Sequence, residues 1–139
     1  MPGTIQTISS SSSNPITANV GDIYTITGAS TVVSGAITIN GGKVIVDQNA
    51  QISPPTPVNV TADGIIVARG GGQVTGGVVI NTGGSMKVVK NGQVTGTVGI
   101  NQGGRMLVGN GDGPGTINGS ISITGIRDIT VNPNSTITM

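Results

Sequence analysis

The side chains that could perform acid–base or metal chemistry are few. The chain of 139 residues has no His, no Cys and no Glu, and its five acidic residues are all aspartates. Without His there is no imidazole base, no Ser–His–Asp triad and no ordinary zinc site. The aspartates fall at unrelated places of the repeat described below, so no acid–base pair is evident. We predict that the protein is not an enzyme and needs no metal or cofactor. The aspartates are Asp22, Asp47, Asp63, Asp112 and Asp128.

Two other binding chemistries have only faint signals. Residues 109–115 read GNGDGPG, which is similar to the calcium-binding nonapeptide of β-rolls, but the string occurs once and Pro114 interrupts it. We interpret it as a glycine-rich turn. The six basic residues are scattered, and Tyr24 is the only aromatic residue, so stacking platforms for bases are missing. We therefore predict no nucleic-acid partner.

The elements that carry these residues are expected to be short strands and turns. The chain is rich in Val, Ile, Thr and Asn and has 25 glycines, while residues that favour helices are scarce. No segment is long and apolar enough to span a bilayer, so we expect no membrane insertion. The N-terminal sequence MPGTIQTISSSSSNP lacks the basic start and apolar core of a signal peptide.

A repeat organises most of the chain. When residues 71–90 are set over residues 91–110, 12 of the 20 positions are identical, and the unit reads Q-V-T-G-x-V-x-I-N-x-G-G-x-M-x-V. The same unit can be followed upstream and downstream with small insertions. Units cover residues 33–46, 52–68, 74–88, 94–108 and 117–131. A period near 20 residues is typical of a solenoid or another stacked array.

The pattern inside each unit predicts a parallel β-solenoid. Val78 and Ile80 alternate with polar or small residues, and so do Met86 and Val88, which indicates two short strands with one buried face each. Gly76 and the group around Asn81 supply turns between them. Each unit is thus one coil of short strands. The predicted fold is all-β, a single-stranded parallel β-solenoid (β-helix) of about six coils.

Stacking turns equivalent positions into columns along the solenoid. One polar column contains Asn40, Asn81 and Asn101, whose side chains can form a hydrogen-bonded ladder along the axis. A second contains Gln51, Gln73 and Gln93. The predicted coil core contains Val74, Val78, Ile80, Met86, Val88, Val94, Val98, Ile100, Met106 and Val108.

The two ends of the array differ from its middle. We assign residues 1–19 to an N-terminal segment with a flexible Ser-rich linker that serves as a cap or an exchanged strand. Residues 20–139 form the solenoid, whose last coil is unfinished. Exposed strand edges recruit other strands, and contacts between unlike ends generate open filaments. The residues predicted to mediate this assembly are Thr4, Ile5, Gln6, Thr7, Ile8, Ile137, Thr138 and Met139.

From these ends we predict a structural, self-associating protein that stacks head to tail. In the sharper form of this hypothesis, the strand around residues 4–9 crosses a linker at residues 10–13 and pairs with a neighbouring copy. The alternative is a ligand-binding module whose side faces bind glycan or a cell surface. Tyr24 is the only aromatic platform that such a glycan site could use.

The unit VTGTVGINQGGRMLV resembles the repeats of AIDA-type autotransporter adhesins, over about residues 31–131. That resemblance implies a β-solenoid passenger at the surface of a Gram-negative bacterium, with roles in adhesion and self-association. The size and the bare ends are also similar to bactofilins, which are cytosolic β-solenoids that polymerise end to end. We therefore expect an extracellular or cell-surface protein, without a leader or with its leader removed; the alternative location is the cytoplasm.

Overall fold

The structure, a computed structural model, describes residues 3–109, 113–119, 121–123, 128–131 and 136–138. Over these ranges the chain forms short β-strands and no helix, as its composition predicts. The strands are β1 Ile5–Ile8, β2 Ile16–Asn19, β3 Ile23–Thr27, β4 Val32–Val33, β5 Ile37–Asn40, β6 Lys43–Asp47, β7 Gln51–Ile52, β8 Val58–Thr61, β9 Ile65–Ala68, β10 Gln73–Thr75, β11 Val78–Ile80, β12 Ser85–Val88, β13 Gly92–Thr95, β14 Val98–Ile100, β15 Arg105–Val108, β16 Gly115–Asn118, β17 Ile121–Ile123, β18 Asp128–Val131 and β19 Thr136–Thr138.

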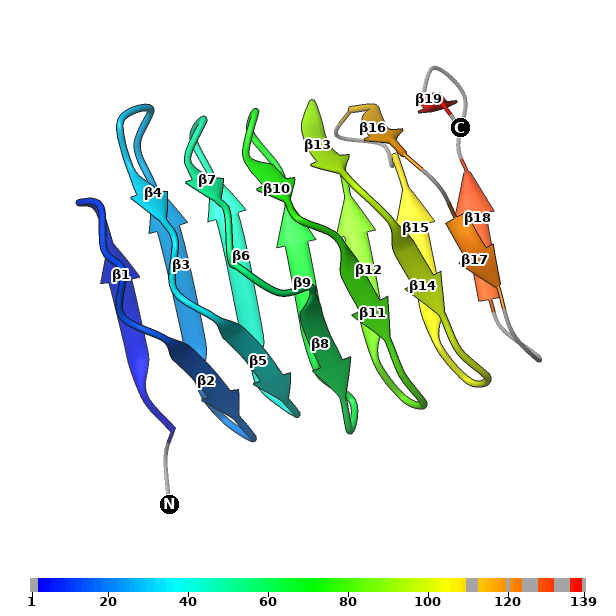
Figure 1. The fold of residues 1–139 in the computed structure, drawn as a ribbon, viewed down its shortest axis with the longest axis horizontal. Coiled ribbons are helices and arrows are strands. Elements are labelled where there is room, and N and C mark those ends of the chain that lie inside the picture. The colour runs from blue at the N-terminus through cyan, green and yellow to red at the C-terminus, as the bar shows by residue number, and fades with distance from the viewer. Residues whose placement is uncertain (1–2, 110–112, 120, 124–127, 132–135, 139) are drawn as a thin grey trace.

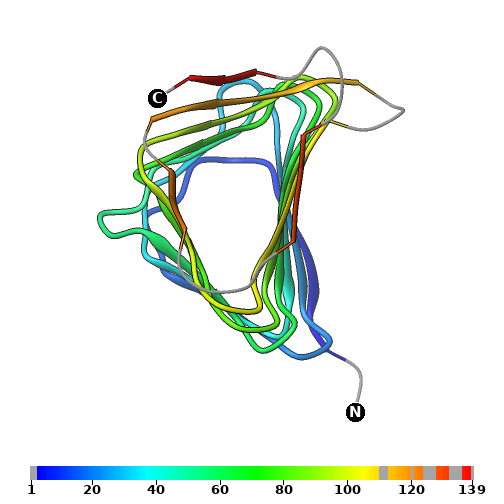
Figure 2. The ribbon, with the colours of Figure 1, turned by 90° about the vertical axis from the view of Figure 1, so that its right-hand side faces the viewer.

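The strands pair in parallel and form three sheets that run the length of the molecule (Figure 1). We name them face A (β1-β3-β6-β9-β12-β15-β18), face B (β4-β7-β10-β13-β16-β19) and face C (β2-β5-β8-β11-β14-β17). Seen along the stack, the three faces enclose a roughly triangular cross-section (Figure 2). The protein is therefore a parallel β-solenoid of about six coils of about 20 residues, as predicted.

The strand register follows the columns predicted from the repeat. Val78 pairs with Val58 on one side and with Val98 on the other, and Met86 pairs with Ile66 and Met106. All ten predicted core residues point inward and are at most 3% exposed. The core is thus a set of aliphatic columns in which each coil covers the next.

Close packing between coils explains the glycines at the corner between faces A and B. Gly72, Gly92 and Gly115 occupy one column at this corner. A Cβ atom on any of them would collide with a backbone carbonyl oxygen of the preceding coil; for Gly92 this is the oxygen of Ala68. The repeated glycine therefore allows adjacent coils to approach at the spacing of hydrogen-bonded strands, about 4.8 Å.

Candidate assembly end at the first coil

Residues 4–19 form the first coil of the stack. β1 pairs with β3 in the register Ile5↔Ile23 to Ile8↔Ile26, and β2 pairs with β5. Between β1 and β2 the chain crosses face B, where Ser12 forms a parallel bridge with Val33. In this single chain the Ser-rich segment is therefore one side of a coil. The exchange of β1 between copies stays a prediction.

Serine hydroxyls hold the connection between β1 and β2 against the second coil. The Ser11 hydroxyl donates to the Ser30 carbonyl oxygen (3.1 Å) and accepts from the Val32 N–H (3.0 Å). The Ser12 hydroxyl oxygen accepts from the Asn14 N–H at 3.1 Å. The two Ser11 hydrogen bonds satisfy backbone groups of the second coil, and only the Ser12–Asn14 hydrogen bond is local to the connection.

Asp22 ties the start of the first coil to the second. Its Oδ1 accepts from the Thr4 N–H at 2.7 Å, and its Oδ2 accepts from the Asn19 N–H at 2.9 Å. These two N–H donors, the one from Thr4 first, hold the pKa of the exposed Asp22 carboxyl below its ordinary value, although partial desolvation opposes them. The Ile23 N–H also donates to the Thr4 carbonyl oxygen at 2.7 Å. Asp22 therefore positions the beginning of β1.

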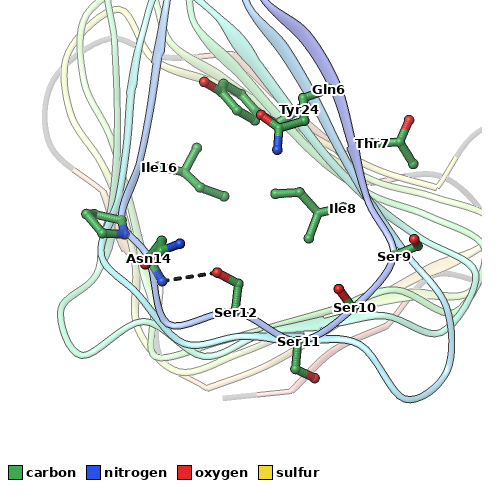
Figure 3. A pocket seen from close by; sticks show the side chains of 11 residues that line it. Gln6, Thr7, Ile8, Ser9, Ser10, Ser11, Ser12, Asn14, Ile16 and Tyr24 are labelled. Atoms are coloured by element: carbon green, nitrogen blue, oxygen red, sulfur yellow. Dashed lines mark hydrogen bonds between the residues drawn. The ribbon is translucent and has the colours of Figure 1, made fainter.

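The first coil surrounds an open mouth at the N-terminal end of the solenoid, a hollow of about 500 Å³ (Figure 3). Ile8, Ile16 and Tyr24 point into it from three different strands, whereas Thr7 and Ser9 point away. No segment among the described residues crosses this mouth. The lining residues are Gln6, Thr7, Ile8, Ser9, Ser10, Ser11, Ser12, Asn14, Pro15, Ile16 and Tyr24.

Two strands of the first coil have an open edge. β1 and β2 are the terminal strands of faces A and C. In a parallel pair, the backbone groups of alternate residues point to opposite neighbours. Because the Thr4 carbonyl oxygen accepts from Ile23 of β3, the backbone groups of Ile5 and Thr7 point to the open edge. That edge presents the N–H and C=O groups with which another parallel strand would pair.

The open edge of β1 lacks the features that usually block edge pairing. Natural edge strands are guarded by charges, prolines or bulges. Residues 3–21 contain no charged residue, and Pro15 lies outside both strands. Ile5 is 79% exposed, which makes it one of the two large apolar side chains that the described part of the chain leaves most open. The edge is thus available and favourable for strand addition.

The opposite end presents the other predicted assembly residues. Ile137 and Thr138 lie in β19, which pairs with β16 as Ile117↔Ile137 and Asn118↔Thr138. β18 is the terminal strand of face A at this end. Met139 lies outside the described residues. One column of face A runs from end to end: Ile5, Ile23, Lys43, Ile65, Ser85, Arg105 and Asp128.

The predicted polar ladder is built from hydrogen bonds between coils. The Asn101 side-chain amide donates to Asn81 Oδ1 at 2.8 Å, and the Thr61 hydroxyl donates to Asn40 Oδ1 at 3.2 Å. Asn19 of the first coil pairs in register with Asn40, so the column begins one coil earlier than the sequence analysis placed it. The signal was present, because ITAN at residues 16–19 matches ITIN at residues 37–40.

Gln6, Thr7 and Ile8, which were predicted as assembly residues, line the mouth, whereas Ile16, Asp22 and Tyr24 were not predicted at this end. Asp22 lies in the turn that the repeat units share: its N–H donates to the Asn19 carbonyl oxygen as the Gly84 N–H donates to Asn81, but here a carboxylate takes the place of the glycine. Ile16 and Tyr24 lie in a divergent stretch, residues 16–27, which has the spacing of the unit but few of its identities. Aligning this stretch on the offset of 21 between Ile16 and Ile37 could have found the first coil.

Other surface features offer little chemistry. Two hollows of about 290 Å³ lie over face A; Arg105 and Ser85 line both, and Asp63 lines one. Within the described ranges no three His, Cys, Asp or Glu side chains gather as metal ligands would. The same ranges contain no helix that could cross a membrane. The GNGDGPG string at residues 109–115 lies partly outside the described residues.

No protein-family model, curated protein or solved structure matches this chain. The resemblances to AIDA-type adhesin repeats and to bactofilins therefore stay predictions, as do the absence of enzymatic activity and the expected location.

Proposed function

We propose that this protein is a structural, self-associating protein whose copies stack end to end into a filament, on or outside a bacterial cell. The observation that carries the proposal is the first coil: β1 has an unguarded open edge, and the coil surrounds an open mouth into which Ile8, Ile16 and Tyr24 point among mainly polar lining residues. The proposed location rests on the resemblance to adhesin repeats alone.

The stacked arrangement follows from extending face A by one spacing. β18 of one copy pairs in parallel with β1 of the next, so Asp128 faces Ile5 and Val131 faces Ile8 by continuation of the columns. The inward column that contains Ile8 continues through Ile26, Val46 and Ala68, all apolar. A second copy seated in this register would cover Ile8 and the mouth, as each coil covers the next within one chain.

Electron microscopy of the full chain over a concentration series tests this proposal. Because face A has seven strands, we expect filaments whose axial repeat equals about seven coil spacings, roughly 34 Å at about 4.8 Å each. Discrete monomers at every concentration would reject end-to-end stacking. In that case saturable binding of a glycan by the monomer would favour a surface-binding module instead.

A further inference from the structure

Charge is distributed unevenly over the three faces. Every charged residue within the described strands lies on face A, and faces B and C have none. The Arg69 guanidinium, directly after β9, pairs with Asp47 at 3.0 Å. The charged residues of the face A strands are Lys43, Asp47, Lys87, Arg105 and Asp128. Face A therefore combines these charges with an apolar cluster of Ile45, Val67 and Val89 that is separate from the main core, and the charges would oppose one another in a symmetric contact between two copies of this face.

Face B presents a regular array of amides and hydroxyls. Gln51, Gln73 and Gln93 pair in register, Thr116 continues this outer column, and Val32 is its one aliphatic member among these strands. Thr75, Thr95 and Asn118 form a second outer column beside it. Gln73 and Gln93 are exposed, and the residues between the two columns, such as Val74, point inward and are buried.

Such an array is complementary to a copy of itself. An amide or a hydroxyl carries both hydrogen-bond donors and acceptors, so two identical faces can satisfy each other without opposite charges. A symmetric contact between two copies requires this kind of self-complementarity. Flat sheet faces with Gln and Asn ladders pair in the same way in stacked β assemblies.

Face C is less suited to such a contact. Its central outer column contains Asn59, Val79 and Gly99, which differ in size and polarity. A Cβ atom built on Gly99 would meet nothing within 4 Å, so the column has a gap there. A flat second copy would leave that gap unfilled.

The area of face B explains why this contact needs a filament. Six strands at about 4.8 Å and a strand width of roughly 13 Å give a face on the order of 400 Å². A stable pair of proteins usually buries about 800 Å² on each partner. One copy is too small, but aligned copies in a filament sum their areas and gain from effective concentration.

We infer that face B is the surface through which filaments of this protein pair side by side, with face B of a second filament as the partner. The inference rests on the proposed end-to-end stacking and names the lateral partner of the same assembly.

The test compares two double variants of the full chain by electron microscopy. Gln51→Lys with Gln73→Lys places two charges on adjacent coils of face B, and Thr38→Lys with Asn59→Lys places the same two charges on adjacent coils of face C. All four side chains point outward and are at least partly exposed. Both variants leave β1 and β18 unchanged, so both should form filaments.

We expect wild-type filaments to associate in pairs, the face C variant to do the same, and the face B variant to form mainly single filaments, with at least a fivefold loss of pairs. Raising the salt to about 1 M shortens the screening length to about 3 Å and should restore pairs in the face B variant. Single filaments in the wild type, pairing that survives the face B charges, or equal loss in both variants would overturn the inference. Absence of wild-type filaments would instead overturn the end-to-end proposal, and the lateral contact with it.

Discussion

The central coils and the first coil have the same three-sided architecture, but a central coil has a neighbouring coil on both sides and the first coil has one on a single side. In the central coils, strands such as β12 pair on both sides, and their inward residues are almost completely buried. In the first coil, β1 pairs on one side only and Ile8 is only partly buried at the mouth. The comparison shows that a coil is stabilised by its two neighbours. Where one neighbour is missing, the same backbone and side chains are left open, and we propose that a second copy covers them.

A variant of the corner glycines should have the largest effect, because it prevents central coils from approaching each other. Gly92→Ala brings a Cβ atom against the carbonyl oxygen of Ala68, a backbone atom that cannot move without shifting its strand. We expect a loss of roughly 3 kcal/mol in the free energy of unfolding, measured by urea denaturation. Ser10→Ala, in the exposed connection of the first coil, is the control and should lose much less. Equal losses would show that the comparison between coils is wrong.

The second largest difference should come from truncating an inward side chain, which should cost more unfolding free energy in a central coil than in the first coil. Met86→Ala opens a cavity between two covering coils and should cost about 3 kcal/mol of unfolding free energy. Ile8→Ala removes a side chain that only one coil covers, so we expect about 1 kcal/mol in dilute monomer. Both are measured by denaturation at concentrations below assembly. If stacking covers Ile8, the unfolding free energy lost through Ile8→Ala should be larger when the measurement is repeated on assembled protein.

The polar ladder should contribute a smaller amount. Asn101→Ala removes the donor to Asn81 Oδ1 in a partly buried pair. We expect a loss of about 1 kcal/mol in the free energy of unfolding, and a double-mutant cycle with Asn81→Ala isolates the coupling. A coupling of zero would mean that Asn at this column serves the turn and not the ladder.

The smallest expected effect is that acid lowers the hydrogen-exchange protection of the first coil before that of the central coils. Because two N–H donors lower the pKa of Asp22, its contribution is complete above the ordinary aspartate value of about 3.9 and is lost as pH falls through the lowered pKa of the folded state. Below about pH 4, the amides of β1 should therefore lose hydrogen-exchange protection before those of β12. Asp22→Asn should show reduced β1 protection already at neutral pH. Uniform loss across all coils would contradict this role.

The repeat made the central coils predictable from the sequence. Glycine, asparagine and methionine recur at a fixed spacing there, because each position meets the same neighbours in every coil. The first coil could not be predicted in the same way, since Ser12 replaces an aliphatic residue on face B and Asp22 replaces the glycine of the repeated turn. The segregation of charge was also missed: Lys43 and Arg105 share one column, separated by the uncharged Ile65 and Ser85, Lys87 lies in another column, and the folded arrangement places both columns on face A.

Sedimentation velocity on variants of position 5 tests most directly whether the open edge of β1 is the assembly end. In the stacked register residue 5 of one copy faces Asp128 of the next, so Ile5→Asp should weaken association roughly fivefold or more through like charges on paired strands, whereas Ile5→Lys should preserve or strengthen it. Ile65→Asp, in the same column of a central coil, is the matched control and should associate like the wild type. If Ile5→Asp and Ile5→Lys behave alike, or if neither changes association, β1 does not pair with β18 and the account of the assembly end is wrong.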